Sequence, residues 1–97
     1  MKKLLIIDDG PSTASLCELF NRYYLEIDVV TSFKDSLMKI NATVYDAVIF
    51  ESCLKSNFQN ESVATLVYIK NRCRNTKVLM KACIYNEESR KDTYYNV

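Results

Sequence analysis

Three carboxylates and one lysine stand directly after short apolar runs, where side chains for chemistry are often placed. These residues are Asp8, Asp9, Glu51 and Lys81. Acids gathered at the ends of strands can bind Mg²⁺ or take part in phosphoryl chemistry, because hard cations prefer carboxylate oxygens. A single acid in a loop is best explained as a solvated charge. Three acids and a lysine at converging strand ends favour a functional site instead.

Four apolar runs predict the strands that would position these side chains. Runs 3–7 and 45–50 are almost continuously apolar, as expected for strands buried on both faces of a parallel sheet. Run 27–31 is rich in β-branched residues and predicts an outer strand, and 78–80 predicts the core of a fourth. The first and third strands are then neighbours. Functional side chains of an open parallel sheet lie beyond the carboxyl ends of its strands, which is where the candidates fall.

Helical spacing of apolar residues separates these strands. The first helix is predicted to begin at Ser12 or Thr13, the second is capped by Ser32, and the third spans 61–72. A last helical segment, polar and marginal in length, is predicted over 87–94. Alternation of strands and helices with short connections indicates parallel strands joined by right-handed crossovers, and hence an α/β fold.

Three segments resemble the response-regulator receiver domain, the CheY-like family of two-component signalling. Leu4–Pro11 resembles the family's first strand with its acidic pair and proline-containing turn, Tyr45–Glu51 is similar to the segment that ends in the phospho-acceptor aspartate, and Lys77–Ala82 matches the fourth strand. The resemblance covers roughly residues 2–90. It implies that the chain, 1–97, is a single receiver-like domain. The implied fold is a flavodoxin-like three-layer sandwich with four parallel strands in the order 2-1-3-4.

The residues that would do the family's chemistry depart from its pattern. Glu51 holds the phospho-acceptor position, and Lys81 holds the position of the family's threonine or serine switch. Glutamate carries its charge one methylene further out, which displaces the oxygen from in-line attack. We therefore expect a pseudo-receiver of phosphorelay signalling, not an enzyme, that acts through protein–protein interaction or dimerisation. The alternative is a working receiver with Mg²⁺-dependent phosphorylation, on Asp8 or Asp9 in place of Glu51.

Lys81 is expected to place its ammonium group near Asp8, Asp9 or Glu51. Acids that share a pocket repel one another, and one fixed cation relieves that repulsion. We expect Lys81 to replace both Mg²⁺ and the lysine that the family carries after its fifth strand, so that no cofactor is required. If a metal is bound at all, Asp9 is the residue expected to hold it. In the alternative interpretation, Lys81 extends into solvent and the pocket has decayed.

The family's fifth strand and helix have no clear counterpart in the residues up to Val97, so both are expected to be absent or vestigial. The fourth strand would then be an open edge beside uncovered apolar surface. Open edges and apolar patches favour pairing with another chain. We therefore expect either a homodimer or a signalling protein as partner.

Overall composition argues against several other classes of protein. Thirteen basic and twelve acidic residues give a net charge of +1, which does not indicate nucleic-acid binding. No apolar run approaches the ~20 residues of a membrane span, so we expect a cytoplasmic protein with no membrane or direct nucleic-acid partner. The cysteines lack Cys-x-x-Cys spacing and histidine is absent, which argues against zinc and thiol redox chemistry. Lys70, Arg72 and Arg74 are interpreted as charges offsetting a helix dipole, with a phosphate patch as the alternative.

Overall fold

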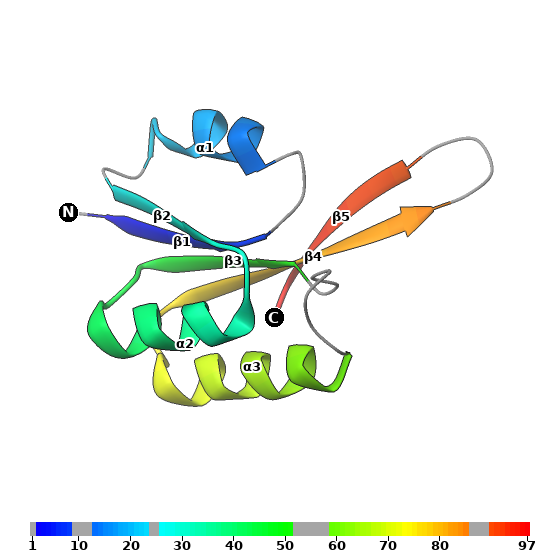
Figure 1. Ribbon diagram of the computed structural model, residues 1–97. Coiled ribbons are helices and arrows are strands. Elements are labelled where there is room, and N and C mark those ends of the chain that lie inside the picture. Colours follow the sequence, from blue (N-terminus) through cyan, green and yellow to red (C-terminus); the bar gives the residue numbers. More distant parts are fainter. Residues whose placement is uncertain (1, 9–12, 24–25, 52–58, 86–89) are drawn as a thin grey trace.

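Four parallel strands and one antiparallel strand form a single sheet with helices on both faces (Figure 1). This computed structural model describes residues 2–8, 13–23, 26–51, 59–85 and 90–97 of the 97. The elements, in chain order, are β1 Lys3–Ile7, α1 Thr13–Phe20, β2 Glu26–Val30, α2 Phe33–Ala42, β3 Ala47–Glu51, α3 Gln59–Arg72, β4 Lys77–Tyr85 and β5 Arg90–Asn96.

The strand order in the sheet is β2-β1-β3-β4-β5. The first four strands are parallel, which confirms the predicted α/β sandwich and the order 2-1-3-4. Helix α1 covers one face of the sheet, whereas α2 and α3 lie side by side on the other (Figure 1). The central strands β1 and β3 are apolar on both faces, and the helices on the two sides of the sheet cover both of these faces.

Alternating side chains of the central strands divide the core into two clusters. The cluster next to α2 and α3 contains the fully buried strand residues Leu5, Ile7, Val48, Phe50 and Val78, together with Ile69 of α3. The cluster next to α1 contains the strand residues Leu4, Ile6, Ala47 and Ile49, together with Leu16 of α1. Burial of this apolar area is the main stabilising term of the fold, and it fixes which residues reach the carboxyl ends of the strands.

Ser32 begins α2 as the sequence predicted. Its Oγ accepts a hydrogen bond of 3.1 Å from the backbone N–H of Asp35, which satisfies one of the free donors of the first helical turn. The first described residue of α1 is Thr13, and Ser12 lies outside the described residues. The cap fixes where the chain leaves β2 and enters the helix.

The segment Arg90–Asn96 is a strand, so the helix predicted over 87–94 is wrong for the part that the structure describes, residues 90–94. β5 runs antiparallel to β4, from the pair Leu79 and Asn96 to the pair Tyr85 and Arg90. The segment offers no apolar stripe for a helix to bury, whereas its Thr and Tyr residues favour a strand. The predicted cap, Asn86, lies outside the described residues.

The presence of β5 changes the expectation about the sheet edge. A fifth strand was expected to be absent or vestigial, but it is present and antiparallel, along β4. The edge of β4 next to β5 is therefore paired with the same chain. The homodimer was predicted because β4 was expected to be an open edge. Since β5 pairs with β4, this reason for expecting a homodimer no longer applies.

Tyr45 joins the connection before β3 to strand β2. Its hydroxyl donates a hydrogen bond of 2.5 Å to Oδ2 of Asp28, and its carbonyl accepts one of 2.6 Å from Oγ1 of Thr76. The ring is buried. Burial, followed by the hydrogen bond to Asp28, raises the pKa of the Tyr45 phenol above its usual value of about 10.

Replacing Tyr45 by phenylalanine is expected to lower the free energy of unfolding by about 1–2 kcal/mol at neutral pH, because one hydrogen bond to a carboxylate is lost. The raised pKa means that the unfolded chain loses the phenol proton first. The Tyr45 contribution is therefore fully present below pH ~10 and declines above it, by up to about 1.4 kcal/mol per pH unit. Urea unfolding at several alkaline pH values should show a steeper decline for the native chain than for Tyr45→Phe. Parallel declines would contradict this role.

Candidate functional site

Asp8, Glu51 and Lys81 form a row across three neighbouring strands at their carboxyl ends. In the register of the sheet, Glu51 of β3 pairs with Lys81 of β4. The pairing of β1 with β3 runs up to Ile7 and Phe50. Asp8 follows Ile7 and Glu51 follows Phe50, so Asp8 and Glu51 also lie opposite each other on neighbouring strands. The backbone N–H of Asp8 donates to the carbonyl of Val30, 3.0 Å away, which holds it in line with β1.

These three residues, named here the Lys81 cluster, share the α1 face of the sheet. The residues two positions earlier on the same strands pack in the core cluster next to α1: Ile6, Ile49 and Leu79. Because side chains alternate along a strand, residues two positions apart point to the same face. The apolar packing of the strands thus determines that the two acids and the lysine converge.

The ammonium group of Lys81 lies between the two carboxylates. Its Nζ is 2.9 Å from Oδ2 of Asp8, to which it donates a hydrogen bond, and 3.5 Å from Oε2 of Glu51. The exposed fractions are 0% for Lys81, 1% for Asp8 and 5% for Glu51. The alternative in which Lys81 extends into solvent is therefore wrong.

Burial makes these charges depend on one another. An isolated charge is strongly disfavoured away from water, so a buried ammonium and a buried carboxylate persist only as a paired and hydrogen-bonded group. With every member ionised, the cluster carries two negative charges and one positive charge. The lysine thus supplies, from within the chain, the cation that two neighbouring carboxylates otherwise take from solution.

Asp9, predicted as the second acid of the pocket and as the residue to hold any metal, lies outside the described residues. Within the part of the chain that the structure describes, no group of three or more histidine, cysteine, aspartate or glutamate side chains could hold a metal ion. Asp8 and Glu51 are the two described carboxylates at the site, and both are close to Lys81.

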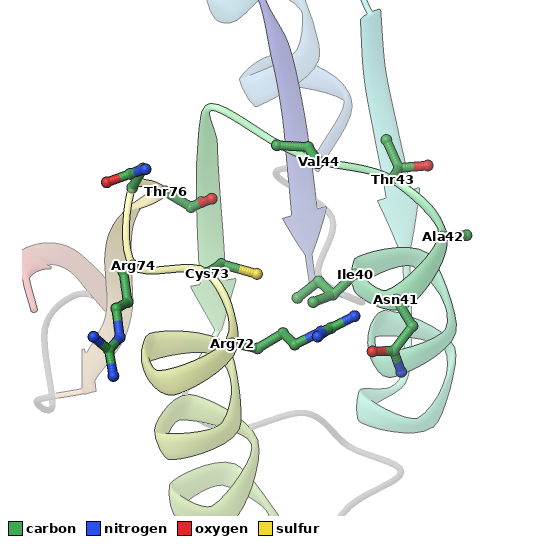
Figure 2. A pocket seen from close by; sticks show the side chains of 10 residues that line it. Ile40, Asn41, Ala42, Thr43, Val44, Arg72, Cys73, Arg74 and Thr76 are labelled. Carbon is green, nitrogen blue, oxygen red and sulfur yellow. The ribbon is translucent and has the colours of Figure 1, made fainter.

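A cavity that the sequence did not predict lies between the ends of α2 and α3 (Figure 2). It is at the amino-terminal end of the parallel strands, opposite the Lys81 cluster. The sequence did single out two of its lining residues, Arg72 and Arg74, as charges at a helix end. It carried no signal that the end of α2, with Asn41 and Thr43, would face them, because that proximity comes from the packing of two helices distant in sequence.

A scan against protein-family models, a search of curated proteins and a search of solved structures each find no match to this chain. The resemblance to receiver domains therefore stays a prediction. None of the helices in the described ranges has the length and apolar character that a membrane crossing requires. The cytoplasmic location likewise stays a prediction.

Proposed function

We propose that this chain is a receiver-like module of phosphorelay signalling that is not phosphorylated and acts by binding another protein. The observation that carries the proposal is the buried Lys81 ammonium group, held 2.9 Å from Asp8 and 3.5 Å from Glu51. The cluster stands at the carboxyl ends of β1, β3 and β4, where the resemblance implies that a receiver would carry out its chemistry.

The cluster disfavours phosphoryl transfer for two reasons. Glu51 is longer than the aspartate of the family, and in-line attack tolerates displacement of the attacking oxygen poorly. Its Oε2 is also within ion-pair distance of Lys81, so a reaction at this carboxylate would have to disrupt a buried pair. Both effects raise the barrier to phosphorylation at Glu51.

Lys81 also removes the usual means of switching. The family carries a hydroxyl at this position, which the resemblance implies reports phosphorylation to the surface. Here the side chain is fully buried and committed to the two acids. Because the cation of this pocket is part of the chain, its charge does not change with phosphorylation. The module would therefore present the same binding surface to its partner at all times.

The test is intact-mass measurement after incubation with acetyl phosphate and Mg²⁺. We expect no added phosphoryl group on the native chain. The variant Glu51→Asp with Lys81→Thr, which restores the family's residues at both positions, is expected to gain one, provided that circular dichroism shows it folded. Glu26→Asp is the matched control, since it shortens an exposed glutamate by the same methylene outside the cluster and should gain none.

Two results would overturn the proposal. A phosphoryl group on the native chain, mapped by fragmentation to Asp8 or Asp9, would establish the alternative of a working phospho-accepting receiver. Tight, specific binding of Mg²⁺ to the native chain in a calorimetric titration would show that Lys81 does not replace the metal.

A further inference from the structure

The cavity between the ends of α2 and α3 combines an apolar floor with a polar rim. Its volume is about 290 Å³. Ile40, Val44 and Cys73 contribute apolar surface, while the lining residues on the polar side include Asn41 and Arg72. Among the described residues, those that line it include no aspartate or glutamate. The chemistry of the lining therefore suits a ligand that has both an apolar part and an anionic part.

Positive charge at this end of the molecule exceeds what the helix ends can offset. Residues 63–77 contain Lys70, Arg72, Arg74 and Lys77 and no acid. The carboxyl end of a helix carries roughly half a negative charge, so α2 and α3 together offset about one of these four cations. Lys70 Nζ donates a hydrogen bond of 2.8 Å to the Val97 carbonyl oxygen, whereas Arg72 and Arg74 line the cavity itself. Arg72 and Arg74 thus provide positive charge at the lining of the cavity.

Arg72 and Asn41 are both polar lining residues of the cavity, one from the end of α3 and the other from the end of α2. Figure 2 shows the Arg72 side chain directed from the end of α3 toward Ile40 and Asn41 at the end of α2. The Asn41 Oδ1 accepts a hydrogen bond of 2.6 Å from the Tyr68 hydroxyl, which fixes the amide and leaves its NH₂ group to donate. The guanidinium fork of Arg72 matches the two oxygens of a carboxylate.

We infer that this cavity binds a peptide segment of a partner protein through an acidic side chain next to a small apolar one. The inference rests on the proposed function, since it names where a binding module would hold its partner. The carboxylate is received by Arg72, and the apolar side chain packs on Ile40 and Cys73. The volume lies at the lower limit of ordinary small-molecule pockets, about 300–1,000 Å³, and fits one or two peptide side chains.

The experiment is selection of a display library of random short peptides on the intact chain. Enriched peptides are expected to carry Asp or Glu beside a small apolar residue. One of them is then synthesised and measured by fluorescence anisotropy. Arg72→Gln is expected to weaken its binding at least about tenfold, because a charge-assisted pair is lost. Replacing the acid of the peptide by its amide should weaken binding to the native chain similarly.

Two matched variants separate the cavity from general charge. Lys34→Gln removes a cation from an exposed position at the start of α2 and should leave binding unchanged within about twofold. Arg74→Gln removes the neighbouring arginine, whose side chain points away from Asn41 in Figure 2, and should have a smaller effect than Arg72→Gln.

The inference is overturned if the enriched peptides are not acidic, if none is enriched, or if Arg72→Gln binds them as well as the native chain does. It is also overturned if free acetate displaces the peptide at concentrations similar to the dissociation constant of the peptide. The cavity would then bind small anions as tightly as it binds the peptide. Peptides that bind elsewhere would leave the proposed binding module intact. The acetyl phosphate experiment tests that function separately.

Discussion

Lys81→Met is expected to lower the free energy of unfolding by about 3–5 kcal/mol, measured by urea unfolding. The substitution removes the ammonium group that lies between Asp8 and Glu51, so that two buried carboxylates lose the cation with which they are paired. Breaking a buried ion pair from one side is more destabilising than removing the pair entirely, because the remaining charge keeps its desolvation penalty. The total free energy of unfolding of a natural domain is about 5–15 kcal/mol, so the variant is expected to be close to unfolding.

A rescue experiment separates this effect from loss of packing. Adding Asp8→Asn and Glu51→Gln to Lys81→Met removes the stranded charges while nearly preserving side-chain volume, and should recover part of the loss. Lys34→Met, on the exposed side of α2, is the matched control and should change stability by less than about 0.5 kcal/mol. If Lys81→Met resembles Lys34→Met, the ion pair does not stabilise the fold.

Phe50→Ala is expected to cost about 3–5 kcal/mol, because a large side chain is removed from a packed core. Phe50 is fully buried and stacks on Phe33 with ring centroids 5.2 Å apart. It also immediately precedes Glu51, so its packing against α2 fixes the end of β3 that presents the carboxylate. Thermal or urea unfolding measures the loss.

The control for Phe50→Ala is Tyr23→Ala, which truncates an aromatic side chain that is 67% exposed. It should change stability by less than about 0.5 kcal/mol. A double-mutant cycle with Phe33→Ala isolates the stacked pair, and a coupling of about 0.5–1.5 kcal/mol is expected. Independent, additive losses would show that the two rings do not stabilise each other.

The two sites occupy opposite ends of the parallel strands. The Lys81 cluster stands at the carboxyl ends, and the cavity lined by Arg72 and Asn41 lies near the amino-terminal ends of β3 and β4. Substitutions in the cavity are therefore not expected to disturb the ion pairs. Binding and phosphotransfer can be tested separately in the same chain.

The order of the parallel strands and the convergence of the candidate residues were predictable from local sequence. Runs 3–7 and 45–50 are apolar on both faces, which requires central strands, and the acids directly follow them. Once the strands are parallel, Asp8, Glu51 and Lys81 must reach one edge of the sheet, because the pairing fixes their register. The hydrophobic pattern of the strands, the polar residues that follow them and the parallel topology were enough to predict this part of the site.

The remaining features depend on contacts between distant parts of the chain. The segment 90–96 has Thr and Tyr residues that favour a strand, but the partner that stabilises this strand is β4, with which it pairs. The sequence was compatible with both a buried and a solvated Lys81, and in the tertiary structure the side chain is 0% exposed beside Asp8 and Glu51. The cavity at Arg72 and Asn41 forms because helices α2 and α3, separated by a whole strand, end beside each other. Local propensity sets each element, but only tertiary packing decides which side chains are removed from water and which are brought together.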